Sequence, residues 1–107
     1  MVKTFDNLTL EEYINSGVPV VVDFWAEWCS PCRMLAPTID QLGEEFTDKV
    51  SIGKLNIDDY KESAAKYGVR SIPTVLFFNK GELMEKFTGV AEKKVYRDKI
   101  EALVSKN

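Results

Sequence analysis

Two kinds of hydrophobic pattern alternate along the chain: continuous apolar runs and apolar residues at helical spacing. Residues 19–25 form a nearly continuous apolar and β-branched run, and residues 51–57 are a second segment of this kind. Such runs are typical of strands that are buried on both faces of a sheet. The spacing i, i+4, i+7 and i+11 is occupied by Leu35, Ile39, Leu42 and Phe46. This spacing predicts an amphipathic helix between the two strands.

The remaining helices are predicted from capping residues and shorter apolar patterns. Thr9 to Glu12 has the form of a capping box, and apolar residues then follow at helical spacing up to Gly17. Residues 59–67 predict a short helix that ends at Gly68, because glycine readily takes the left-handed conformation needed there. A last amphipathic helix is predicted from Val95, Tyr96, Ile100, Leu103 and Val104.

Two further apolar runs, 74–78 and 83–88, are joined by a short link that contains a glycine. Such a link fits an antiparallel hairpin and cannot hold a crossover helix. With a short first strand at 2–5, the predicted order is β followed by αβαβαββα. We therefore predict one α/β domain over residues 1–107, in which helices cover both faces of a mixed sheet.

The composition excludes several classes of site. The chain has two cysteines and no histidine, so it has no Ser-His-Asp or Cys-His catalytic pair and no imidazole ligand. Two cysteines alone cannot complete a structural zinc site, which needs four such ligands. With 14 basic and 17 acidic residues, the chain does not have the charge expected of a nucleic-acid-binding domain.

No segment has the pattern of a targeting signal or a membrane span. Residues 1–7 contain neither a basic region nor an apolar core of the kind found in signal peptides. The longest apolar run, 18–28, is interrupted by Pro19, Asp23 and Glu27. We therefore expect no membrane association and, as the simplest assumption, a cytoplasmic location, although a presequence that had been removed would leave no trace.

Both cysteines lie where the strand at 19–25 gives way to the long helix. Cys29 falls at or near the N-cap of that helix, where free N–H groups and the helix dipole favour an anion. This position should favour the thiolate, which is the nucleophilic form. Pro31 suits the first helical turn. Cys32, one turn further on, is placed to attack a mixed disulfide formed on Cys29.

Other roles for the cysteine pair are weaker. A structural disulfide across so few residues would constrain the unfolded chain by only about 2 kcal/mol. A zinc site would need carboxylate ligands or a second chain. Two unrelated buried cysteines would not often fall at this spacing on such a junction. The favoured interpretation is a redox-active Cys29–Cys32 disulfide, with no metal and no bound cofactor.

The residues around the pair resemble the active site of the thioredoxin family. Residues 22–29, Pro31 and Cys32 match the family's active-site strand and loop almost residue for residue. Other segments that match family landmarks, in the same order, are 36–37, 54–58, 67–70, 72–74 and 87–89. The positions that depart from the commonest family residues are Ser30, Ser71 and Thr88. The resemblance spans nearly the whole chain and implies the thioredoxin fold, with a central five-stranded mixed sheet flanked by four helices.

The resemblance also implies the chemistry of the site. Cys29 would be the nucleophile and Cys32 the resolving cysteine, in a loop that includes Trp28, Ser30 and Pro31. Asp23 would be a buried carboxylate that transfers the proton of Cys32 through water, and Lys54 would lie near Asp23 and tune it. On the residues alone, Asp23 could instead lie at a solvated strand end and Lys54 could be an exposed strand lysine.

A substrate surface around the reactive sulfur is implied as well. The family has a cis-proline at the position of Pro73, and the backbone of Ile72 before it would pair with a substrate segment. The positions that would form this surface are Trp28, Ile57, Ile72, Pro73, Thr88, Gly89 and Val90. For Ile57 and Val90, ordinary core packing is an equal alternative.

The implied activity is protein-disulfide reduction by a monomeric dithiol electron carrier. Thioredoxin reductase would recycle it, and ribonucleotide reductase, peroxiredoxins and methionine sulfoxide reductases would be among its clients. Two alternatives stay open. The same surface could serve a non-redox binding module, or the protein could be an oxidase or isomerase, which a reduction potential would decide.

Overall fold

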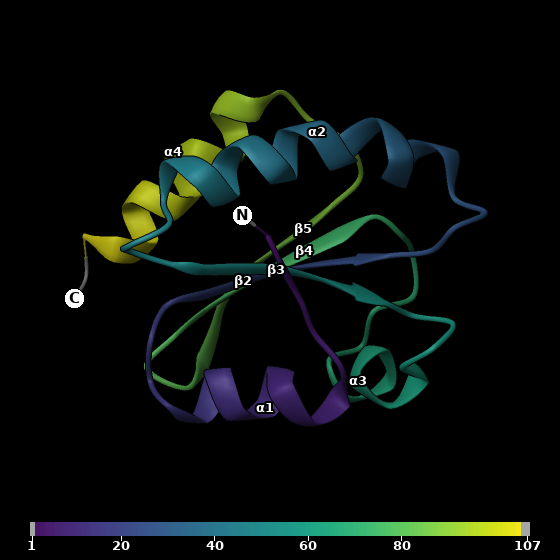
Figure 1. Ribbon diagram of the computed structural model, residues 1–107, viewed down its shortest axis with the longest axis horizontal. Coiled ribbons are helices and arrows are strands. Elements are labelled where there is room, and N and C mark those ends of the chain that lie inside the picture. Colours follow the sequence, from purple (N-terminus) through teal and green to yellow (C-terminus); the bar gives the residue numbers. More distant parts are fainter. Residues whose placement is uncertain (1, 106–107) are drawn as a thin grey trace.

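The computed structural model describes residues 2–105 and contains the elements that the sequence predicts, in the same order (Figure 1). The strands are β1 (Lys3–Thr4), β2 (Val20–Trp25), β3 (Ser51–Asn56), β4 (Thr74–Asn79) and β5 (Glu82–Thr88). The helices are α1 (Asn7–Asn15), α2 (Ser30–Glu45), α3 (Lys61–Lys66) and α4 (Lys93–Val104).

The strands form one mixed sheet in the order β1-β3-β2-β4-β5. β3 runs parallel to both β1 and β2, whereas β4 is antiparallel to β2 and β5. Helices α2 and α4 cover one face of this sheet, and α1 and α3 cover the other (Figure 1). The predicted fold class is therefore confirmed.

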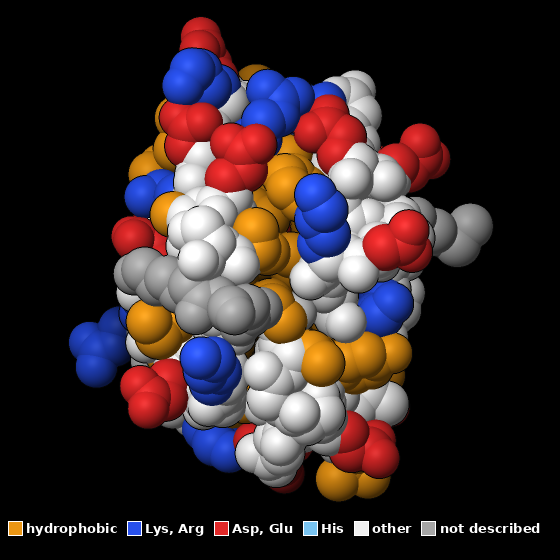
Figure 2. Space-filling view, turned by 90° about the vertical axis from the view of Figure 1, so that its left-hand side faces the viewer, with side chains coloured by type: hydrophobic (Ala, Val, Ile, Leu, Met, Phe, Trp, Pro, Cys, Tyr) orange, Lys and Arg blue, Asp and Glu red, His pale blue; other side chains and the backbone are white. Residues whose placement is uncertain are grey.

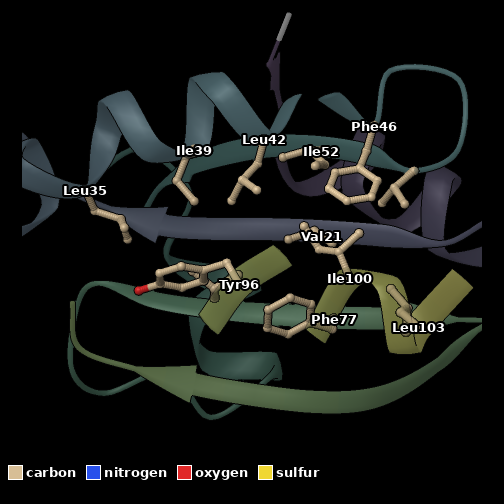
Figure 3. Packing of buried hydrophobic residues seen from close by; sticks show 12 residues of the cluster. Val21, Leu35, Ile39, Leu42, Phe46, Ile52, Phe77, Tyr96, Ile100 and Leu103 are labelled. Atoms are coloured by element: carbon tan, nitrogen blue, oxygen red, sulfur yellow. The ribbon is translucent and has the colours of Figure 1, made fainter. Parts of the chain in front are cut away.

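The central strand β2 is buried on both faces, as its apolar run predicts. Val21 packs in a cluster with residues of α2 and α4, and Figure 3 shows Leu35 and Ile39 of α2 directed toward β2. Val22 and Phe24 pack on the other face, against α1. Because side chains alternate along a strand, Asp23 projects to the same face as Val21, beneath α2.

The first helix begins earlier than the sequence predicted. Asp6, not Thr9, is the N-cap of α1: its Oδ1 accepts from the Thr9 amide at 2.8 Å, and the Thr9 Oγ1 accepts from the Asp6 amide at 2.9 Å. The prediction of a capping box at Thr9–Glu12 was wrong because Thr9 closes the box from its helical end. Helix α3 is also shorter than the predicted 59–67 and has no side-chain cap.

The β4–β5 link is the predicted hairpin. Its two central residues, Lys80 and Gly81, have φ values of 54° and 80°, as a tight turn between twisted strands requires. No helix within residues 2–105 has the length and apolar character needed to cross a membrane. At the end of the molecule that bears this hairpin, basic and acidic side chains are interspersed around apolar ones (Figure 2).

Candidate active site

The cysteine loop joins the end of β2 to the start of α2. Cys29 is the N-cap of α2, and its Sγ accepts a hydrogen bond from the Cys32 amide at 3.2 Å. Ser30 and Pro31 are the first two residues of the helix, where the missing N–H of proline costs no helical hydrogen bond. The predicted N-cap position of Cys29 is confirmed, so a thiolate there would face the partly positive end of a helix dipole.

Cys29 and Cys32 form a disulfide, with their Cα atoms 5.2 Å apart. Both residues are nearly buried, with 4% of Cys29 and 2% of Cys32 exposed. The apolar side chains packed around them are Trp25, Ala26, Ile57 and Ile72. Within residues 2–105, no group of three or more His, Cys, Asp or Glu side chains could hold a metal ion. The arrangement is suited to thiol–disulfide exchange.

Asp23 is buried in the sheet beneath α2, with 1% of its surface exposed. Neither carboxylate oxygen has a hydrogen-bond partner in the described part of the chain. Burial raises the pKa of Asp23 to about 7, and the positive charge of Lys54 only partly offsets this effect. The carboxyl can therefore exchange a proton near neutral pH. A solvated strand end, the alternative left open by the sequence, is not what the structure shows.

Lys54 lies beside Asp23 in the sheet, in register with it across the β2–β3 pair. Its Nζ lies 4.4 Å from the centroid of the Trp25 ring, a cation–π contact. The residue is half-buried, so it is not a freely solvated strand lysine. Trp25 packs beneath the cysteine loop and also orients this ammonium group.

The Ile72–Pro73 peptide bond is cis, as the family resemblance implied. The Pro73 carbonyl accepts a hydrogen bond from the Gly89 amide at 2.9 Å. The hydroxyls of Thr74 and Thr88 lie 3.1 Å apart and form a second link. These bonds hold the end of β5 against the proline loop.

Two apolar side chains of the expected substrate surface are exposed to solvent. Trp28 is 67% exposed and Val90 is 46% exposed. Ile57 and Ile72 are half-buried against the cysteine pair and also contact the core beneath α1. Core packing is therefore ruled out for Val90, while Ile57 contributes to both the core and the site.

Sequence reasoning missed Asp58, which accepts a hydrogen bond from the Trp28 indole Nε1 at 2.9 Å. Asp58 also donates its backbone N–H to the Asn56 side chain at 2.9 Å. Two signals could have pointed to it: Asp58 ends the landmark segment 54–58, and it is a charged residue just after a strand that ends beside the cysteine loop. The contact joins residues 30 positions apart, so no local pattern reveals it.

Comparisons with known proteins agree on one family. The family model described as Thioredoxin matches residues 1–102. The thioredoxin of Rickettsia typhi is 48% identical over 87 residues, covering 81% of this chain and 83% of that protein. The chloroplastic M-type thioredoxin of Pisum sativum is 49% identical over 94 residues, covering 88% of this chain.

The chain spans only about half of the plant relative, 55% of its length. Among solved structures, a mutant thioredoxin from Halobacterium salinarum NRC-1 superposes with a TM-score of 0.86 at 31% identity. The match covers 94% of this chain and 88% of that one. The likeness therefore extends over nearly the whole described fold.

Proposed function

The chain belongs to the thioredoxin family, and we propose that it reduces disulfides of client proteins through its Cys29–Cys32 pair. One observation carries this proposal. Cys29 is at once the N-cap of α2, an acceptor of the Cys32 amide and one half of a disulfide. A sulfur so placed is a good leaving group when the disulfide opens and a stabilised thiolate afterwards. The chain thus has the fold and the redox-active pair of a dithiol–disulfide oxidoreductase.

The exchange takes two displacement steps. In the dithiol form, the Cys29 thiolate attacks one sulfur of a client disulfide, which breaks that S–S bond and releases the other client sulfur as a thiolate. Cys32 then loses its proton and attacks Cys29 in the mixed disulfide. This step releases the second client thiolate and forms the disulfide that the structure contains. The client gains two electrons, and the cysteine pair loses them.

Asp23 is proposed to accept the proton of Cys32 in the second step. Its carboxyl is buried on the face covered by α2, the helix that bears Cys32, and it has no protein hydrogen-bond partner in the described chain. A carboxyl with a pKa of about 7 is ionised often enough to accept a proton and returns it readily to water. Lys54, in register with Asp23, would tune this balance by stabilising the carboxylate.

The client segment is proposed to pair with the backbone of Ile72. Neither its N–H nor its C=O bonds to another backbone group in the loops that the structure describes, so both are available to an added strand. The apolar surface for client side chains is proposed to consist of Trp28, Ile57, Ile72, Pro73, Thr88, Gly89 and Val90. Ser30 and Pro31, at the exposed start of α2, complete the loop beside the reactive sulfur.

Recycling requires a reductant for the oxidised pair. Thioredoxin reductase is the proposed donor, and the proposed clients are ribonucleotide reductase, peroxiredoxins and methionine sulfoxide reductases. We propose that the protein acts as a monomer in a reducing compartment. The cytoplasm is the proposed compartment, and a plastid is the alternative suggested by the chloroplastic relatives.

An insulin-reduction assay tests the proposed activity. The wild-type chain, supplied with NADPH and thioredoxin reductase, should reduce insulin disulfides, and Cys29→Ser should abolish turnover. Turnover retained by Cys29→Ser would disprove the mechanism. Binding of clients without any wild-type turnover would favour the binding-module alternative. A reduction potential near those of oxidases or isomerases would favour an oxidising role instead.

A further inference from the structure

A groove of about 410 Å³ opens between β1, β3 and the middle of α2. The residues that line it are Val2, Lys3, Thr4, Asp40, Glu44 and Lys54. The charged side chains of Lys54, Asp40 and Glu44 therefore share this lining, whereas the Lys3 Nζ lies 5.5 Å from the centroid of the Tyr13 ring on α1. Among the described residues, none of the charged groups of Lys54, Asp40 and Glu44 takes part in an ion pair. Their charges are free to act on their surroundings.

Lys54 connects this groove to the buried carboxylate. On β3 it is in register with Asp23, and in the groove it shares the wall with Asp40 of α2. Its contact with the Trp25 ring holds the ammonium without an ion pair to either carboxylate in the described chain. The Lys54 ammonium thus attracts two carboxylates, that of buried Asp23 and that of exposed Asp40.

We propose that Asp40 is a positioning residue for the disulfide exchange: across the groove it competes with Asp23 for the Lys54 ammonium and so keeps the Asp23 carboxyl able to hold a proton. This inference rests on the proposed role of Asp23. Without Asp40, the whole attraction of Lys54 would favour ionised Asp23. The carboxylate would then be a weaker base toward the Cys32 thiol.

The other described groups that face Asp23 are uncharged, so the charges that act on its carboxyl are those of Asp40 and Lys54. From α4, the Tyr96 hydroxyl donates to the Gly89 carbonyl at 3.1 Å, and burial raises the pKa of Tyr96, so it stays neutral. β4 places uncharged Val75 in register with Asp23. From α2, Cys32 is held in the disulfide. Burial has the largest effect on the pKa of Asp23. Of the two charges that act on it, Lys54 lowers the pKa and Asp40 raises it.

The first test follows the Asp23 carboxyl itself, by its ¹³C NMR titration in the oxidised protein. Asp40→Asn should move the midpoint toward acid by roughly 0.5 pH unit or more. Glu44→Gln is the matched control, because it removes the same charge from the same groove one helical turn further along α2. It should move the midpoint by less than half as much. An unmoved midpoint in Asp40→Asn, or equal shifts in both variants, would overturn the inference.

Competition for Lys54 is tested by the same titration in a Lys54→Met background. There the effect of Asp40→Asn should shrink to a small part of its original size, because the shared cation is gone. A shift as large as that in the wild-type background would show direct repulsion between the carboxylates. That result would contradict the proposed competition.

The pH profile of the exchange rate separates this inference from the proposed function. If the roles of Asp40 and Asp23 are both correct, Asp40→Asn shifts the pH profile by the same amount as the NMR midpoint. In an Asp23→Asn background, Asp40→Asn then has no effect on the profile. If the NMR midpoint of Asp23 moved but the pH profile of the exchange rate did not, neither Asp40 nor Asp23 would take part in the exchange. An unmoved midpoint, in contrast, would overturn only the role of Asp40.

Discussion

The indole of Trp28 is fixed by the carboxylate of Asp58, which accepts its Nε1–H at 2.9 Å. Although the ring is exposed, this bond defines its orientation beside Cys29. A client that packs on the ring therefore meets a surface that is already ordered, and binding does not have to restrict its motion.

Replacing Asp58 with alanine should weaken client binding. Loss of one hydrogen bond of about 1 kcal/mol should raise KM for a protein disulfide roughly threefold to tenfold, with a smaller effect on kcat. Asp58→Asn, which keeps an acceptor oxygen, should retain most of the activity. Steady-state kinetics with insulin would check this. A lowered kcat with unchanged KM would show that the bond serves the chemistry instead.

Replacing Cys32 with serine should trap clients on Cys29. The first displacement still occurs, but no thiol remains to resolve the mixed disulfide. Non-reducing gels and intact-mass spectrometry should show a covalent adduct that dithiothreitol releases. The double variant Cys29→Ser, Cys32→Ser is the control and should form none. An adduct that survives in the double variant would place the reactive group elsewhere.

A negative charge at Val90 should interfere with protein clients but not with small thiols. Val90→Asp places a carboxylate in the proposed apolar surface, and desolvating it against a client should raise KM about tenfold. Met84→Asp on β5 is a matched control, because Met84 is 44% exposed and Val90 is 46% exposed. Both variants should react with dithiothreitol at wild-type rates. Equal KM values for insulin in Val90→Asp and Met84→Asp would show that Val90 is not part of the proposed client surface.

The buried carboxyl of Asp23 should make stability fall as pH rises. Its pKa is 3.8 in a model peptide and about 7 in the fold, so between these values the folded protein holds a proton that the unfolded chain has lost. Asp23 therefore stabilises the fold fully below about pH 4, and this contribution is lost as pH rises to about 7. Above pH 7 the loss is complete and amounts to at most about 4 kcal/mol.

In Asp23→Asn, the free energy of unfolding should accordingly not fall in this way as pH rises. This variant should be more stable than the wild type at pH 8. Urea unfolding of the oxidised proteins at pH 5, 7 and 8 would measure it. Asp48→Asn, at an exposed position, is the control and should keep the wild-type slope. An unchanged slope in Asp23→Asn would mean that the carboxyl is not protonated in the folded protein at pH 5.

The layers of the fold could be predicted because the buried strands are continuous apolar runs and the helices have regular spacing. The start of α1 could not, because Asp6 and Thr9 are both good N-cap residues and only the folded backbone shows which one caps the helix. In the site, the cysteine loop is local in sequence. The Trp28–Asp58 bond and the Lys54–Trp25 contact join separate segments, and such contacts leave no periodic signal.

The antiparallel course of β4 places the Lys80–Gly81 turn at the opposite end of the sheet from the cysteines, since Phe24 pairs with Thr74 and Val20 with Phe78. The turn is exposed, and it contributes nothing to the groove beneath α2 or to the client surface. New chain ends or an inserted domain at this point would leave the redox chemistry untouched. The fold thus offers an attachment point for a tether or a reporter at a distance from the cysteine pair.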